Sequence, residues 1–227
     1  MQYRNEQKFY ISQAAYHRLR GPLAAVAQLD ANADAYGEYH IRSLYFDDQY
    51  NTSLIDKWDG VEFRDKYRIR MYHLNPDKLR MEIKIKTREY ISKLSTPVSQ
   101  PDCRRILDGD IAFLLEGDTV QTHYFRRMRS GMSPCVIVDY RREAYTLPYE
   151  DARITFDKDL RTGIYAHNML DPDLPTLPVL PPGLMVLEVK FNHFLPGHIR
   201  ALLASIEAQR SPVSKYVLCR RFSEAGV

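Results

Sequence analysis

Charged and apolar residues alternate along several segments of this 227-residue chain. Because successive side chains of a β-strand point to opposite faces, such alternation predicts strands with one charged face and one apolar face. In the clearest segment, the charged residues are Arg80, Glu82, Lys84 and Lys86, and the apolar residues between them are Met81, Ile83 and Ile85. Sixteen Tyr and nine Phe also favour strands over a helical bundle. We therefore expect a large sheet whose two faces differ in chemistry.

The positions of apolar residues also place the expected elements. Strands are predicted over 3–11, 38–47, 65–72, 78–87, 134–145, 152–157 and 183–191, with a short one over 90–94. Helices are predicted over 13–29, 99–116, 119–129 and 196–209. Ser12 is expected to cap the first helix, and Gly21-Pro22 to kink or split it. The proline-rich segment 171–183 is expected to be an extended connection, which gives one α+β domain over residues 1–227.

The charged faces carry mainly Arg, Lys and Glu, whereas a solvated face usually mixes Ser, Thr, Asn and Gln with its charges. They comprise Glu6 and Lys8; Lys66, Arg68, Arg70 and Tyr72; Arg80, Glu82, Lys84 and Lys86; Tyr140 and Arg142; Arg153, Thr155 and Asp157; and Glu188 and Lys190. An ordinary sheet with one face in water explains any one of these strands. If helices cover the apolar faces and the sheet curls, the charged faces line the interior instead. We expect a closed antiparallel β-barrel tunnel with a charged lumen and helices packed outside.

A lumen of this kind needs a partner for its charge. Several cations packed together repel one another, so an anion of high charge density should lie among them. Arginine forks and lysine ammonium groups suit the oxygens of a phosphate chain. Glu6, Glu82 and Glu188 would face phosphate unfavourably unless a divalent cation lay between them, and Mg²⁺ or Mn²⁺ meets that requirement. The charges therefore predict a site for a metal and a polyphosphate.

Composition argues against several other classes of protein. A net charge of +3 argues against a general nucleic-acid coat. No apolar run reaches the roughly 18–20 residues of a membrane-spanning helix, and the N-terminus lacks the apolar stretch of a signal peptide. Cys103, Cys135 and Cys219 lack CxxC spacing, which indicates reduced thiols and no zinc site. We expect a cytoplasmic protein with no membrane span and no nucleic-acid partner.

Nine short motifs resemble, in their order along the chain, those of the triphosphate tunnel metalloenzymes. They are EQKF at 6–9, SLYFD at 43–47, KWDG at 57–60, KYRIR at 66–70, EIK at 82–84, YRREAY at 140–145, RITFD at 153–157, VLEVKF at 186–191 and SKY at 214–216. Each motif is weak alone, but the ordered set is specific and covers about 3–216. It is similar to the branch typified by the catalytic domain of the vacuolar transporter chaperone complex, the polyphosphate polymerase domain.

The resemblance implies an antiparallel tunnel that binds ATP and a divalent metal, transfers the terminal phosphoryl group to a growing polyphosphate chain and releases ADP. It implies catalytic, phosphate-binding roles for six basic residues, which are Lys8, Arg68, Arg70, Lys84, Arg142 and Lys215. Lys57, in a K-x-x-G element, and Lys190 are expected to bind the nucleotide phosphates as well. Glu188 matches the metal-binding catalytic glutamate, and Glu6 is the expected second ligand of Mg²⁺ or Mn²⁺.

Two departures from the family pattern refine this expectation. Arg4 stands where the wider superfamily often has the first Glu of E-x-E-x-K, so a second metal is not expected. The inositol-phosphate-sensing domain and the membrane segments of the eukaryotic complex are also missing from this sequence. We therefore expect a stand-alone soluble form, whose partners are ATP, triphosphate and polyphosphate.

Two alternatives stay open at the level of the sequence. An inorganic or nucleoside triphosphatase would use the same tunnel with water as the nucleophile, and Glu6 or Glu82 leaves that possibility open. A non-catalytic polyphosphate-binding module would bind triphosphate without turnover. The polymerase itself needs no general base, because the terminal oxygen of the acceptor chain is already ionised at neutral pH.

Overall fold

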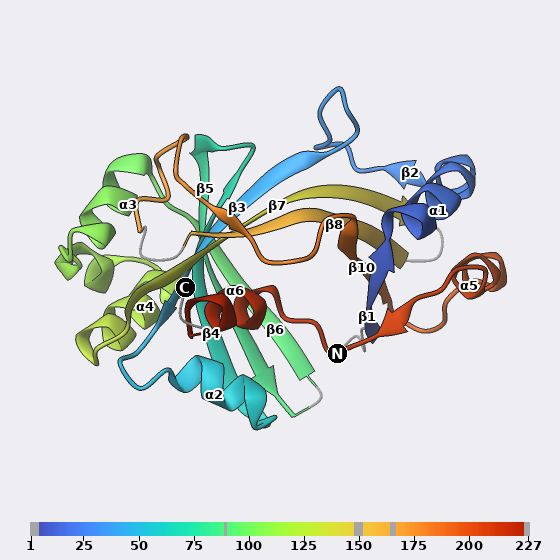
Figure 1. Ribbon diagram of the computed structural model, residues 1–227. Helices are drawn as coiled ribbons and strands as arrows, with labels where there is room; N and C mark the ends of the chain where they lie inside the picture. The colour runs from blue at the N-terminus through green and yellow to red at the C-terminus, as the bar shows by residue number, and fades with distance from the viewer. Residues whose placement is uncertain (1–4, 89, 148–151, 164–166, 225–227) are drawn as a thin grey trace. The chain divides into compact units, whose positions relative to one another are not determined.

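The computed structural model describes residues 5–88, 90–147, 152–163 and 167–224 (Figure 1). Arg4, at which the sequence departs from the superfamily pattern, lies outside these residues. The chain forms two compact units. Unit 1 comprises residues 1–40, 140–160 and 178–214, and unit 2 comprises 41–139, 161–177 and 215–227.

The strands follow one hydrogen-bonded path in the order β11, β1, β10, β8, β7, β3, β4, β5 and β6, while β2 pairs with β7 and β9 with β8. Neighbouring strands of known register are antiparallel. This large antiparallel sheet, together with its helices, confirms the α+β class. Within the described ranges the path is open at β11 and β6, so the expected closed barrel is not confirmed.

Unit 1 contains the first strand and helix of the chain and its last two strands. Its elements are β1 (Asn5–Ser12), α1 (Gln13–Val26), β2 (Gln28–Leu29), β10 (Leu184–Phe191), α5 (Gly197–Ala204) and β11 (Gln209–Arg210). Strands β3 (Tyr39–Asp47), β7 (Ser133–Leu147) and β8 (Ala152–Gly163), and the short β9 (Leu177–Pro178), contribute residues to both units.

The core of unit 1 lies between helices and the apolar faces of its strands. Leu187, Val189 and Phe191 of β10 pack with Leu19 and Leu23 of α1. Further core residues come from β7, β8 and α5, and include Tyr145, Ile154, Phe156 and Ile199. This arrangement confirms the prediction that the apolar face of the last long strand lies under helices.

Unit 2 contains the remaining elements, which are α2 (Thr52–Trp58), β4 (Phe63–Tyr72), β5 (Asn75–Thr87), β6 (Tyr90–Pro97), α3 (Gln100–Leu107), the 3-10 helix η1 (Ala112–Glu116), α4 (Thr119–Arg129) and α6 (Lys215–Glu224). Its core joins Ile69, Met81 and Ile83 to Ile106 of α3 and Tyr124 of α4. Figure 1 shows α3 and α4 beside β4 and β5, in agreement with this packing. The opposite face of the two strands carries the charges.

Local chemistry explains where the predicted helices begin and end. The Ser12 side chain accepts a hydrogen bond from the Ala15 amide, which confirms it as the cap of α1. Pro22 does not split α1, which runs on to Val26. The single helix predicted over 99–116 is wrong, because Gly109 takes a left-handed conformation (φ +83°) that ends α3. After the four residues 108–111, the chain turns again as η1.

Other differences concern short helices. The pattern over 196–209 predicted a longer helix than α5, which ends at Ala204. Helices α2 and α6 were not predicted, since seven and ten residues give little periodicity to detect. Among the described residues, no helix is long and apolar enough to cross a membrane.

Candidate functional site

In unit 2, charged side chains share one face of β4, β5 and β6. We call Lys66, Arg68, Arg70, Glu82, Lys84 and Lys93 the basic cluster. Its residues lie opposite one another in the antiparallel register, with Lys66 against Lys84, Arg68 against Glu82, and Lys84 against Lys93. Directly opposed side chains in such a register have Cβ atoms about 5 Å apart. The fold therefore gathers side chains from three strands into one group.

Glu82 is the centre of the basic cluster, and it is only 1% exposed. Its Oε2 atom accepts a hydrogen bond from Arg68 Nε at 2.7 Å and lies 3.9 Å from Arg70 Nη1. Its Oε1 atom forms an ion pair with Lys93. Burial alone would raise the pKa of Glu82, but the charges of Arg68, Arg70 and Lys93 lower it to about 2. Glu82 is thus an anion at neutral pH, surrounded by cations.

Ser43 and Tyr45 of β3 hold the two arginines from the other side. Arg68 Nη1 donates to the Tyr45 hydroxyl at 2.8 Å, and Arg70 Nε donates to Ser43 Oγ at 3.1 Å. Burial would raise the pKa of Tyr45, yet the nearby charges of Arg68, Arg70 and Lys215 lower it. Ser43 and Tyr45 were in a recognised motif but were not predicted as site residues. The available signal was their spacing of two residues, which puts both side chains on one face of β3. In the structure Ser43 lies opposite Arg70, and Tyr45 opposite Arg68.

Lys215 is the first residue of α6, and the next residue anchors that helix. The Tyr216 hydroxyl donates to Asp47 Oδ2 at 2.5 Å, and the Tyr216 ring packs against the Tyr45 ring at a tilt of 34°, with centroids 5.1 Å apart. Lys66 Nζ lies 4.6 Å from the centroid of the same ring. Tyr216 thereby fixes the start of α6, including Lys215, beside the basic cluster.

Lys57 lies in the last turn of α2, a helix that packs against β4 and α6. The structure thus places Lys57 in unit 2 with Arg68, Arg70, Lys84 and Lys215. Its predicted role in binding phosphates stays a prediction.

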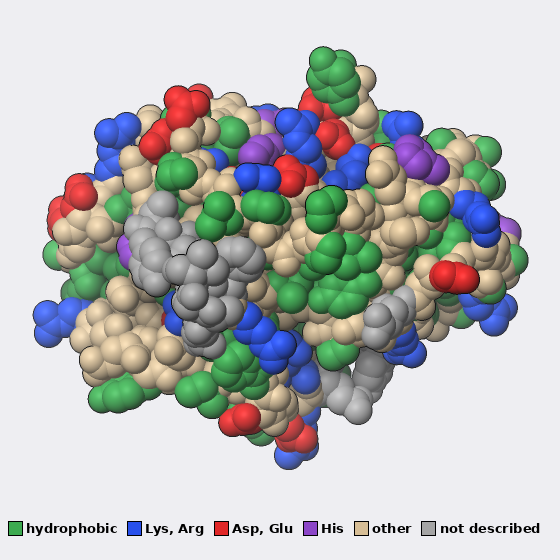
Figure 2. Space-filling model, viewed as in Figure 1, with side chains coloured by type: hydrophobic (Ala, Val, Ile, Leu, Met, Phe, Trp, Pro, Cys, Tyr) green, Lys and Arg blue, Asp and Glu red, His purple; other side chains and the backbone are tan. Residues whose placement is uncertain are grey.

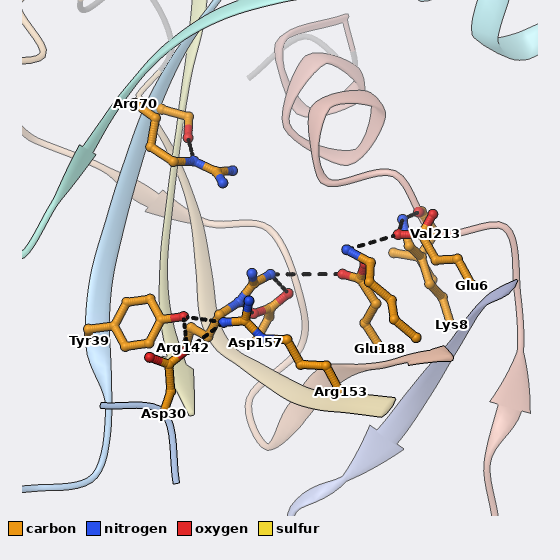
Figure 3. A network of polar contacts seen from close by, with 12 residues as sticks. Glu6, Lys8, Asp30, Tyr39, Arg70, Arg142, Arg153, Asp157, Glu188 and Val213 are labelled. Atoms are coloured by element: carbon orange, nitrogen blue, oxygen red, sulfur yellow. Dashed lines mark hydrogen bonds and ion pairs between the residues drawn. The ribbon is translucent and has the colours of Figure 1, made fainter. Parts of the chain in front are cut away.

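In unit 1, a second group lies on the charged face of β1, β10, β8 and β7. We call Glu6, Lys8, Arg142, Asp157, Glu188 and Lys190 the carboxylate cluster. Figure 3 shows Arg142, Asp157 and Glu188 pointing toward one another. Arg142 makes a two-pronged pair with fully buried Asp157, at 2.7 and 2.9 Å, and its Nη2 atom lies 3.8 Å from Glu188 Oε2. Burial opposes the charged form of Arg142, but Asp157 keeps its pKa well above the usual value.

The two predicted metal ligands share a cation in the same cluster. Lys190 Nζ lies 2.6 Å from Glu188 Oε1 and 3.4 Å from Glu6 Oε1. Lys8 Nζ lies 3.5 Å from Glu6 Oε1 and donates to the Val213 carbonyl at 3.3 Å. The structure therefore brings Glu6, Lys8, Arg142, Glu188 and Lys190 together in unit 1, whereas Arg68, Arg70, Lys84 and Lys215 belong to unit 2. The roles predicted for these residues stay predictions.

The donor set of the carboxylate cluster fits a divalent cation that also binds phosphate. Glu6 and Glu188 both reach one ammonium group, so a single cation can contact both. Mg²⁺ commonly uses one or two carboxylates and completes its octahedron with water and substrate phosphates. No group of three or more His, Cys, Asp or Glu able to hold a metal occurs among the described residues, so a cage made by the protein alone is not formed there.

Thr155 gives a further sign of a ligand in this cluster. It lies directly opposite Glu188 in the register of β8 and β10, and it is buried. Within the described residues its hydroxyl oxygen has no hydrogen-bond partner. Because buried hydroxyl groups are rarely left without a partner, a water or a ligand oxygen is expected beside it.

The family comparison agrees with this chemistry. The model of the VTC domain family matches residues 3–223. The chain belongs to the VTC domain family. Membership of this family indicates a protein that handles triphosphate or polyphosphate. A search among curated proteins found no significant match to this VTC domain.

Solved structures of other proteins show that the VTC domain shares their fold. A Bacillus halodurans protein provisionally named an adenylate cyclase is 13% identical, with a TM-score of 0.55 over 94% of each chain. A Vibrio parahaemolyticus protein with the same provisional name is 10% identical, with a TM-score of 0.50 over 96% of this chain and 97% of that one. A Pyrococcus horikoshii protein is 11% identical, with a TM-score of 0.50 over 97% and 99% of the two chains.

Proposed function

We propose that this VTC domain is a metal-dependent polyphosphate polymerase. It transfers the terminal phosphoryl group of ATP to the end of a polyphosphate chain and releases ADP. The observation that carries the proposal is the charge of the basic cluster, in which five cationic side chains accompany a single carboxylate, that of Glu82, and three of them contact it. Four of these cations are buried or half-buried. Such an excess of positive charge is stabilised by an anion with several charges, and phosphate chains have the matching oxygens.

The extent of the cationic surface favours a long chain as substrate. Along β4 the basic positions recur every second residue, about 7 Å apart, from Arg70 through Arg68 to Lys66. Lys84 and Lys93 continue the row across the sheet, and Lys86 follows on β5. Figure 2 shows basic side chains grouped over the region where Figure 1 has α6 and β6. This row is longer than three linked phosphates, which supports a polymerase over a triphosphatase.

The chemistry asks the side chains mainly to position and neutralise the phosphates. Arg68, Arg70, Lys84 and Lys215 hold the phosphate oxygens and orient the γ-phosphorus for in-line attack. A terminal oxygen of the acceptor chain forms the new bond to that phosphorus, while the bond to the β–γ bridging oxygen breaks and ADP leaves with its electron pair. Because the acceptor oxygen is already ionised, no side chain has to remove a proton.

The carboxylate cluster supplies the metal ligands in this proposal. Glu188 and Glu6 hold Mg²⁺ or Mn²⁺, and Lys8 and Arg142 bind phosphate oxygens beside it. When bound, the divalent ion would neutralise negative charge on the phosphate oxygens beside these residues.

Incubation of the purified protein with ATP and Mn²⁺ tests the proposal directly. Polyphosphate and ADP in matching amounts are expected, as measured by gel electrophoresis and phosphorus NMR. Release of inorganic phosphate alone would replace the proposal with a triphosphatase. Tight binding of triphosphate without turnover, with every divalent metal tried, would replace it with a binding module.

A further inference from the structure

We propose that Lys190 acts as an internal cation that holds the metal position until substrate arrives. Its ammonium group lies between Glu6 and Glu188, and a divalent ion must displace it. The displaced ammonium then binds a phosphate oxygen, so metal and triphosphate favour each other's binding. This inference rests on the proposed function, because it takes Glu6 and Glu188 as the metal ligands.

The contacts of Lys190 single it out from the other cations of the carboxylate cluster. Its Nζ atom contacts both carboxylates, at 2.6 Å from Glu188 and 3.4 Å from Glu6. Arg142 is held by Asp157 through two short hydrogen bonds and lies 3.8 Å from Glu188. Lys8 reaches Glu6 and a backbone carbonyl. Lys190 is thus the cation whose position coincides best with that of a shared metal ion.

Lys190 is also able to move away. Its side chain is 33% exposed, whereas that of Glu188 is 6% exposed. A lysine ammonium is a compact charge on a flexible four-carbon stem, so it can leave the carboxylates without disturbing the backbone. The buried carboxylate of Glu188 stays in place because β10 is paired on both sides, with β1 and with β8. Glu6, with a side chain that is 21% exposed, lies on β1, which pairs with β10 along its whole length.

This arrangement couples the two ligands. Without triphosphate, the metal must remove an ammonium group from two carboxylates, so its affinity is lowered. With triphosphate bound, Lys190 has phosphate oxygens to contact, and the metal replaces it at smaller cost. By thermodynamic linkage, triphosphate then strengthens metal binding by the same factor as metal strengthens triphosphate binding.

An ordinary ion pair is the competing explanation, since Lys190 lies directly opposite Glu6 in the antiparallel register. Such a pair would hold β1 against β10 and have no specific effect on a metal. Lys8 provides the matched control. It lies on β1 directly opposite Glu188 of β10, contacts Glu6 and carries the same charge as Lys190. Loss of either lysine removes one positive charge near the carboxylates.

The experiment measures Mn²⁺ affinity of the full chain by isothermal titration calorimetry and by the EPR signal of free Mn²⁺, with and without inorganic triphosphate. Without triphosphate, Lys190→Gln should bind Mn²⁺ about tenfold more tightly than wild type, and Lys8→Gln should gain clearly less. The strengthening of Mn²⁺ binding by triphosphate should be smaller in Lys190→Gln than in wild type. Mn²⁺ should also raise the melting temperature of Lys190→Gln more than that of wild type.

Three results separate failure of this inference from failure of the proposed function. Mn²⁺ affinity of Lys190→Gln equal to or below that of wild type would overturn the inference, and so would an equal gain in Lys8→Gln. If the double variant Glu188→Gln/Lys190→Gln bound Mn²⁺ as tightly as Lys190→Gln alone, the proposed metal site would be wrong. Absence of polyphosphate synthesis by the wild type, with the expected binding changes intact, would remove the polymerase activity alone.

Discussion

At the scale of single residues, three E-x-K pairs look alike in the sequence but have different surroundings in the structure. They are Glu6 with Lys8, Glu82 with Lys84, and Glu188 with Lys190. Glu82 contacts three cations, including two arginines. Glu6 and Glu188 share a lysine that is partly exposed. Glu82 is therefore suited to order Arg68 and Arg70, whereas Glu6 and Glu188 are suited to exchange their cation for a metal.

The proposed division of roles predicts different responses to substitution. Glu188→Gln keeps the size of the side chain but removes a metal ligand, so activity should fall and be partly restored by high Mn²⁺. Arg70→Ala removes a phosphate contact, so activity should fall without restoration by metal. A charged contact made in the transition state contributes about 3–4 kcal/mol, or a hundred- to thousandfold in rate. Steady-state rates over a range of Mn²⁺ concentrations test both, and normal metal dependence in Glu188→Gln would contradict the assignment.

A second residue-scale prediction concerns stability in acid. Burial alone would raise the pKa of Glu143, but hydrogen bonds from Tyr145, Tyr16, Lys158 and Arg20 lower it to about 2. The unfolded chain therefore binds a proton more readily than the folded protein does. The stability from Glu143 is fully present above about pH 4.5 and is lost as the pH falls toward 2.

Glu143→Gln should thus flatten the decline in stability over that range, as measured by urea unfolding at a series of pH values. The lowered pKa of Glu143 corresponds to a contribution of ~3 kcal/mol to the free energy of unfolding. Glu116→Gln, a change at an exposed residue at the end of η1, is the control and should leave the decline unchanged. An equal effect of the two substitutions would contradict the role given to the Glu143 hydrogen bonds.

At the scale of elements, the antiparallel register of β4, β5 and β6 determines how far the cationic surface extends. Lys66, Lys84 and Lys93 lie side by side across the three strands. Like charges directly opposite one another destabilise a sheet, so we expect an anion to bind beside half-buried Lys66 and Lys84. An exposed edge lysine such as Lys93 also discourages sheet-to-sheet association, but its ion pair with Glu82 turns it toward the basic cluster.

This surface predicts that affinity rises with the length of the phosphate chain. Wild type should bind long polyphosphate more tightly than triphosphate. In the double variant Lys86→Gln/Lys93→Gln, this gain in affinity should be about tenfold smaller. Calorimetric titration at two salt concentrations measures both affinities, and the gain should shrink at high salt.

The matched control for this prediction is Arg126→Gln with Arg129→Gln. This double variant also removes two positive charges, but from exposed positions of α4. That helix packs on the apolar face of β4 and β5. If the control lost the gain and the lysine variant kept it, α4 and not the basic cluster would be the binding surface for long chains.

At the scale of the whole molecule, the free energy of the folded state includes repulsion among the clustered cations. An anion that binds only the folded state should relieve this repulsion and raise the melting temperature. We expect a rise of several degrees with triphosphate and Mn²⁺, and little change with adenosine, as measured by differential scanning fluorimetry. Equal rises with adenosine and triphosphate would show that the phosphates are not the part recognised.

The local pattern of the sequence was enough to predict most of the strands and their two faces. Strand β7 was predicted over 134–145 and spans Ser133–Leu147, and helix α4 was predicted with the bounds that it has. Such features depend on neighbours two to four residues away, which the sequence displays directly. The same alternation identified Arg68, Arg70 and Lys84 on one face, and Glu188 with Lys190 on another.

Only the tertiary structure decided which charges meet. Pairing of β4 with β5 and β6 brings Lys93 to Glu82, and pairing of β1 with β10 brings Glu6 to Lys190. Tyr216 contacts Asp47, 169 residues away in the chain, and so positions the start of α6. The chemistry of each face is local because a strand repeats every two residues, whereas the choice of ion-pair partner depends on register between distant strands. The sequence therefore determined which groups this VTC domain has, and the fold decided which of them act together.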